Sequence, residues 1–83
     1  MPRYALHPQV GLREERFGAL AYHYGNRRLT FLNDDKLVAV VRTAGDYDDI
    51  AAALDAAGVP VHQHDAYIKA LDRLREAEVL VCE

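Results

Sequence analysis

Two runs of alternating residues flank the dipeptide Gly25-Asn26, and this arrangement predicts a β-hairpin over residues 17–32. A two-residue loop of glycine and asparagine between such runs is one of the stronger local indications of a hairpin. With this dipeptide as the loop, Tyr24 faces Arg27, and this first pair fixes the register of all the remaining pairs. The register then places these residues opposite one another: Tyr22 and Leu29, Leu20 and Phe31, Ala21 and Thr30, His23 and Arg28.

This register separates the large apolar side chains from the small and polar ones, because successive side chains on a strand point to opposite faces. The face with the large apolar side chains carries Leu20, Tyr22, Leu29 and Phe31, and the other carries Ala21, His23, Arg28 and Thr30. An antiparallel sheet commonly packs one face on the core and exposes the other to water. We therefore expect the large apolar residues to face the core.

Alternation at Val10 and Leu12 predicts one more strand before the hairpin, with Pro8 at its entry. After the hairpin, Asn33 is the expected N-cap of a first helix that runs to about Ala44. Asp46 and Asp49 then resemble a capping box for a second helix.

Gly58 ends the second helix, and a third helix begins near Asp65. The apolar residues 79–82 can form a short C-terminal strand or a packed tail. The expected fold class is therefore α+β, with a three-stranded antiparallel sheet followed by three helices.

The composition is that of a globular protein with room for one core. The chain has 83 residues, of which 51% are hydrophobic and 28% charged. It contains no apolar run near the roughly 18 residues that a membrane span needs, and no signal-peptide core, so we expect a cytoplasmic protein without a membrane partner. The net charge of −3 argues against nucleic acid as a partner.

Residues able to carry catalysis or hold a cofactor are scarce. Serine is absent, and the single cysteine, Cys82, has no histidine near it in sequence to activate it. His62 and His64 could share one face of a strand, but a tight zinc site needs three or four ligands. We expect no metal, no cofactor and no enzymatic activity.

Four segments carry a resemblance to a known family: HPQV at residues 7–10, FGAL at 17–20, RRLTFLN at 27–33 and LVAVVR at 37–42. The chain resembles, over almost its whole length, the peptide chaperones of mycofactocin systems. These belong with the pyrroloquinoline quinone peptide chaperone among the recognition elements for ribosomally made, post-translationally modified peptides. One departure is Glu78, where members of the wider group are expected to carry a glycine.

The resemblance implies a winged helix-turn-helix-like fold in which residues 1–83 form one recognition domain, with the sheet in 1–32 and the helices in 33–78. It implies binding of the leader of a precursor peptide and its presentation to a radical S-adenosylmethionine maturase. Leader binding in this group uses the third strand and the third helix. The peptide-binding residues expected here are Arg27, Arg28, Leu29, Thr30, Phe31, Leu32, Tyr67, Ile68, Lys69, Leu71, Asp72 and Arg75.

The residues themselves support this expectation, since an exposed strand edge can capture an extended peptide by β-augmentation. Tyr67, Ile68 and Leu71 would form the walls of a groove, although for Leu71 core packing is favoured over exposure in the groove. If the Thr30 N–H faces the peptide, a proline at that position would weaken binding.

Two other functions stay open. Helices two and three could form the helix-turn-helix of a DNA-binding protein, but Asp65, Asp72 and Glu76 make the third helix a poor match for phosphates. A small adaptor that forms a homodimer through its bare strand edge is the second alternative.

Overall fold

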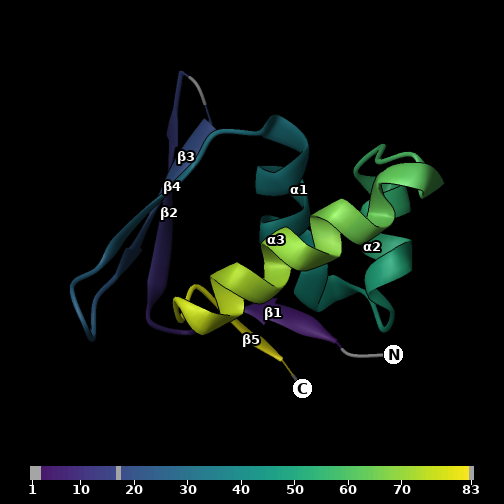
Figure 1. Cartoon of the computed structure of the whole chain (residues 1–83). Helices are drawn as coiled ribbons and strands as arrows, with labels where there is room; N and C mark the ends of the chain where they lie inside the picture. Colours follow the sequence, from purple (N-terminus) through teal and green to yellow (C-terminus); the bar gives the residue numbers. More distant parts are fainter. Residues whose placement is uncertain (1–2, 17, 83) are drawn as a thin grey trace.

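The computed structural model describes residues 3–16 and 18–82 and confirms the expected α+β fold. A three-stranded antiparallel sheet precedes three α-helices, and a short strand follows them (Figure 1). The elements are β1 (Tyr4–Leu6), β2 (Val10–Glu15), β3 (Gly18–His23), β4 (Leu29–Leu32), α1 (Asp35–Thr43), α2 (Ile50–Ala56), α3 (His64–Glu76) and β5 (Leu80–Cys82). Two 3-10 turns, Ala44–Asp46 and Val61–Gln63, precede α2 and α3. Phe17, the first residue of the predicted hairpin, lies outside the described residues.

The predicted register of the hairpin is confirmed: Tyr22 pairs with Leu29, and Leu20 with Phe31. The turn, however, is longer than the two residues expected. The Arg27 N–H donates to the carbonyl of His23, and Arg27 adopts a left-handed φ of 60° instead of facing Tyr24 as a strand residue. The His23 ring explains the longer turn, because its Nδ1 accepts from the N–H groups of both Gly25 and Asn26.

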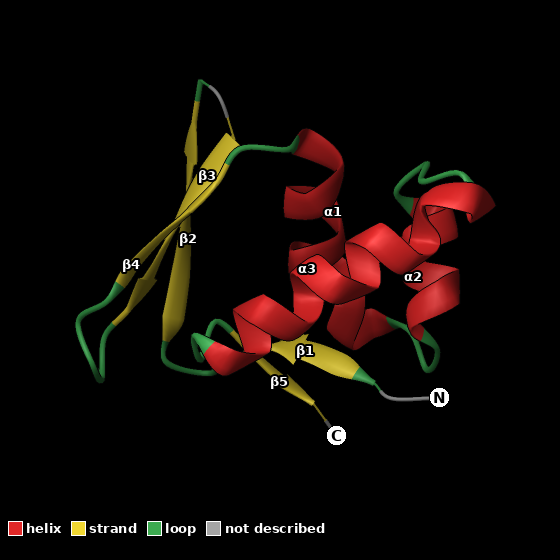
Figure 2. Cartoon of the chain, in the orientation of Figure 1, coloured by secondary structure: helices red, strands yellow, loops and turns green. Residues whose placement is uncertain are grey.

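A second, two-stranded sheet joins the two ends of the described chain, where β1 pairs antiparallel with β5 (Figure 2). The short C-terminal strand was expected, but β1 was not. Three residues are too few to show an alternating pattern, and the partner strand lies at the other end of the sequence. The Tyr4 ring is buried in the core, and its hydroxyl donates to Asp72 at 3.0 Å.

The helix starts differ from the predicted ones in detail. The N-cap of α1 is Asp34 and not Asn33, since the Asp34 side chain accepts from the N–H groups of Lys36 and Leu37. The N-cap of α2 is Asp49, so the expected capping box with Asp46 does not form. Asp46 instead ends the 3-10 turn that follows α1.

The expectation that the large apolar face of the sheet packs on the core is wrong. Ala19 and Ala21 are buried with 0% and 2% of their surface exposed, whereas Leu29 is 64% and Phe31 51% exposed. In Figure 1, α1 lies on the same side of the sheet as the other helices. Small side chains on that inner face let α1 approach closely. The face with the larger apolar side chains is therefore not the one that is buried, because a core must be filled by side chains of fitting shape as well as polarity.

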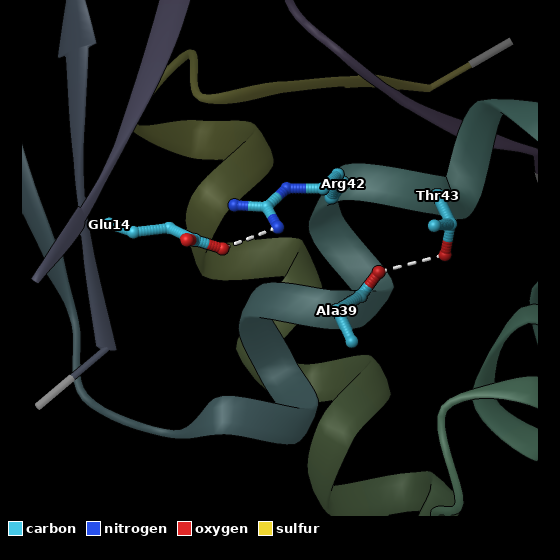
Figure 3. A network of polar contacts seen from close by, with 4 residues as sticks. All are labelled: Glu14, Ala39, Arg42 and Thr43. Carbon is cyan, nitrogen blue, oxygen red and sulfur yellow. Dashed lines mark hydrogen bonds and ion pairs between the residues drawn. The ribbon is translucent and has the colours of Figure 1, made fainter.

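Gly18 makes the close approach of β3 and β4 possible. A Cβ atom at this position would overlap the carbonyl oxygen of Leu32, and the φ of 145° is one that side-chain-bearing residues rarely adopt. A salt bridge joins β2 to α1 at the rim of the inner face, with Arg42 Nη1 and Glu14 Oε1 2.6 Å apart (Figure 3). In the next residue, Thr43 Oγ1 donates to the carbonyl of Ala39.

Candidate functional site

The free edge of β4 is the first part of the candidate site. In the three-stranded sheet, β4 pairs only with β3, so its other edge has no strand partner among the described residues. The His23 N–H donates to the carbonyl of Arg28, which fixes the phase of the antiparallel ladder. Residues alternate along such a ladder between bonding to the partner and facing away. The backbone groups of Leu29 and Phe31 therefore face the open edge.

The same alternation turns the Thr30 N–H toward β3, where it belongs to the ladder with Ala21. The Thr30 N–H therefore does not face a peptide at the open edge, which was the condition for a proline at Thr30 to test peptide binding. Such a substitution would damage the sheet itself, and Phe31 is the position at which a proline removes a donor from the open edge.

An apolar hollow of about 200 Å³ lies near the end of β4, between the start of α1 and the first half of α3. Its lining consists of Asp34, Leu37, Ala66, Tyr67 and Ala70. β4 ends at Leu32, two residues before Asp34, so the open edge and the hollow are neighbours in the chain. The small side chains of Ala66 and Ala70, one helical turn apart, leave the space that larger residues would fill.

A hydrogen bond closes one side of this hollow, where Tyr67 Oη donates to Asp34 Oδ2 at 2.8 Å. Burial alone raises the pKa of Asp34, but the hydrogen bonds from Tyr67, Leu37 and Lys36 outweigh it and hold the pKa below its usual value. Burial and the same hydrogen bond raise the pKa of Tyr67. The contact fixes the aromatic ring at the junction of α1 and α3.

The expected binding residues of α3 lie in different surroundings, and only one of them lines the hollow. Tyr67 lines the hollow, Ile68 packs against the core, and Lys69 is exposed. Asp72 and Arg75 lie elsewhere: Asp72 accepts from Tyr4 Oη and from Arg75 Nε.

The remaining expected residues, which include Leu71 of α3, also differ in accessibility. The side chains of Leu32 and Leu71 are buried at 2% and 0% exposure, so Leu71 is a core residue. Arg27 and Arg28 are exposed at the turn between β3 and β4.

Asp34, Leu37, Ala66 and Ala70 line the hollow but were not predicted as site residues. Alanine and leucine on a helix have no property that distinguishes a hollow from the core. Asp34, two residues after the end of β4, was the available clue, because an N-cap fixes where α1 starts relative to β4.

Side chains able to hold a metal do not gather in the described part of the chain. No group of three or more histidine, cysteine, aspartate or glutamate residues lies close enough there to hold an ion. His64 Nε2 lies 3.1 Å from the carbonyl of Val59 and 3.3 Å from Asp55, within the turn between α2 and α3. Among the same residues, no helix combines the length and apolar character of a membrane span.

An α+β domain with a bare strand edge beside an apolar hollow belongs to the class of small binding domains, and the comparisons identify which one. The model of the peptide chaperone MftB family matches residues 3–81, and the chain belongs to this family. This confirms the resemblance noted in the sequence. Peptide chaperone is a non-catalytic role, in agreement with the expectation that the chain is not an enzyme.

Curated relatives support the assignment. The chain is 49% identical over 76 residues to the peptide chaperone MftB of Mycobacterium tuberculosis. This match covers 92% of this chain and 70% of that protein. It is 46% identical to the Mycobacterium ulcerans protein of the same name, with the same coverage. The Mycolicibacterium smegmatis protein is also 46% identical, and the match covers 74% of it. No solved structure matches the chain significantly.

Proposed function

We propose that the chain binds the leader region of a ribosomally synthesised peptide, the mycofactocin precursor, and presents it to a radical S-adenosylmethionine maturase. In this proposal residues 1–83 act as one recognition domain, and the leader adds as a strand to β4. The observation that carries it is the open β4 edge beside the apolar hollow. The relatives' name, peptide chaperone, supports the same role.

Backbone pairing alone would not give tight binding. Leu29 and Phe31 each offer one N–H and one C=O at the edge, so an added strand gains about four hydrogen bonds of about 1 kcal/mol net each. Ordering a flexible peptide costs about 2–5 kcal/mol. The two contributions nearly cancel, and side-chain contacts must supply most of the affinity.

The hollow provides those contacts. Side chains of a strand added to β4 alternate between the helix side and the outer side of the sheet. An apolar leader side chain on the helix side would enter the space between Leu37, Tyr67 and Ala70. Burying one leucine-sized side chain there contributes about 1.5–3 kcal/mol.

The first arm of the test uses Phe31→Pro, which removes the edge donor, with Phe31→Ala as the matched control that keeps it. Binding of a fluorescently labelled precursor peptide is followed by anisotropy, and folding by circular dichroism. We expect Phe31→Pro to weaken binding about tenfold, because a donor is lost and the ring obstructs the edge. We expect Phe31→Ala to change binding less than about threefold. A folded Phe31→Pro protein that binds like Phe31→Ala would rule out strand addition at β4.

The second arm fills the hollow with Ala66→Phe and compares it with Ala52→Phe, an exposed alanine on α2. Only Ala66→Phe should weaken peptide binding, by about tenfold, since the added ring occupies the space for the leader side chain. Duplex DNA and a protein-concentration series serve as controls for the DNA-binding and dimeric alternatives. Equal peptide affinity of the two variants would place the apolar contact outside this hollow.

A further inference from the structure

The outer face of the three-stranded sheet carries a continuous apolar surface that lies outside the hollow proposed to hold the leader side chain. The register aligns Gly11, Tyr22 and Leu29 in one row across the strands, and Arg13, Leu20 and Phe31 in the next. Leu29 and Phe31 are largely exposed, as is Tyr24 at 64%. In Figure 2 the helices lie on one side of this sheet, and its other side is uncovered. We call Leu20, Tyr22, Tyr24, Leu29 and Phe31 the outer patch.

The aromatic part of the outer patch is already ordered. The rings of Tyr22 and Tyr24 pack edge to face with their centroids 5.1 Å apart. The Tyr24 hydroxyl lies over Gly11, where a Cβ atom would collide with it. Rigid tyrosine rings lose little side-chain entropy on binding, which is why they are frequent at protein interfaces.

The charge around the outer patch indicates the kind of surface that fits it. Residues 10–32 contain four arginines and two glutamates, although the whole chain has a net charge of −3. Arg13 has 81% of its side chain exposed and forms a salt bridge with Glu15 on the same strand, while Glu14 points to α1 and Arg42. Arg16 and Arg27 are exposed in the turns that follow β2 and β3. A partner with an apolar centre and an acidic rim is complementary.

A second copy of the chain fits less well. A twofold contact through the outer patch would bring together two identical faces with a net positive charge, and like charges at an interface are unfavourable. The complementary partner is therefore a different protein.

The outer patch continues directly into the proposed peptide site. Leu29 and Phe31 belong to both, since their side chains lie on the outer face and their backbone groups on the open edge. A leader strand added to β4 would extend the outer face by one strand. We infer that the outer patch is the docking surface for the modifying enzyme, which would contact the patch and the bound leader side by side. This inference rests on the proposed function.

The test separates docking from peptide binding by using positions remote from the β4 edge. Tyr24→Asp and Arg13→Glu change the patch and its rim, and Val61→Asp places the same acid at an exposed apolar residue on the turn before α3. Binding of the radical S-adenosylmethionine maturase and of the labelled precursor peptide are measured separately for each folded variant. We expect both patch variants to weaken maturase binding at least tenfold and to change peptide binding less than twofold. Val61→Asp should change neither.

The inference is overturned if maturase affinity is unchanged within twofold in both patch variants, or if Val61→Asp causes an equal loss. Binding of the wild-type chain to phosphatidylglycerol vesicles that only the patch variants lose, with maturase binding intact, would assign the patch to a membrane surface. A shift from dimer to monomer with maturase binding intact would assign it to a second copy. Failure of the proposed function has a different signature, namely no saturable binding of the peptide or of the maturase by the wild-type chain.

Discussion

The inner and outer faces of the β2–β3–β4 sheet differ in a way that hydrophobicity alone does not explain. On the inner face, Ala19 and Ala21 are almost fully buried beneath α1, whereas on the outer face Leu29 and Phe31 are at least half exposed. A chain that only maximised apolar burial would place its faces the other way round. The difference shows that small side chains on the inner face allow a helix to approach closely, and that the larger apolar side chains of the outer face are left accessible for the docking inferred above.

The largest effect is expected where β3 and β4 approach each other most closely, in Gly18→Ala. The new methyl group would overlap the Leu32 carbonyl, and the backbone conformation is one that essentially only glycine adopts, so unfolding should become easier by about 3 kcal/mol or more. Urea denaturation measures this loss. Gly58→Ala is the control, because that glycine also has a positive φ, 83°, but nothing lies within 4 Å of the added group. Equal losses in the two variants would show that the contact with Leu32 is unimportant.

A pair of opposite changes breaks the comparison directly. Ala21→Leu adds volume under α1 and should lower the free energy of unfolding by about 1–3 kcal/mol. Leu29→Ala removes a larger apolar group from the outer face and should lower it by about 0.5 kcal/mol or less, since that side chain is already in water. Thermal and urea unfolding of both proteins give the two values. A greater cost for Leu29→Ala would mean that the outer face is part of the core.

The smallest effect concerns the Tyr67–Asp34 contact between α3 and the start of α1. Tyr67→Phe should lower the free energy of unfolding by about 1 kcal/mol or less, because one partly exposed hydrogen bond is lost. The pKa of Asp34 is depressed below its usual 3.8 in the folded protein, so this stabilisation is fully present above that value. It is lost as the pH falls through the lower folded-state pKa. Urea midpoints at pH 6 and near pH 3 should show the difference between wild type and Tyr67→Phe shrinking in acid, and a growing difference would contradict the assignment.

Local patterns were sufficient to predict the three-stranded sheet and the three helices. The register of β3 and β4 follows from residue alternation around the turn, and it is confirmed from Ala19–Leu32 to Tyr22–Leu29. The choice of buried face could not follow in the same way, because it depends on how closely α1 packs. Alternation shows that two faces differ but not which one a helix covers.

The candidate site was only partly accessible from the sequence for a related reason. Edge strand and third helix were expected, but the hollow depends on small residues such as Ala66 and Ala70 being placed opposite α1. Asp72 and Arg75 were expected in the same peptide site as Tyr67, but in the structure Asp72 accepts from Tyr4 Oη and from Arg75 Nε, away from the hollow.

Glu78 shows the opposite case, in which an apparent departure has a structural explanation. It adopts a φ of 65° at the end of α3, where the Val79 N–H donates to the carbonyl of Leu74. This is the helix-end conformation that glycine usually occupies, which accounts for the glycine expected there. The Glu78 side chain accepts from Asn26 Nδ2 at 2.7 Å and so joins the hairpin turn to the helix end.

The pairing of β1 with β5 has a consequence for the order in which the chain assembles. The β2–β3–β4 meander forms from neighbouring segments, whereas Tyr4 and Cys82 can meet only after almost the whole chain has closed into a loop. Closing a long loop costs more chain entropy than closing a short one. On this argument, the strands β2, β3 and β4 that the proposed partners use form early, and the pairing of β1 with β5 forms last.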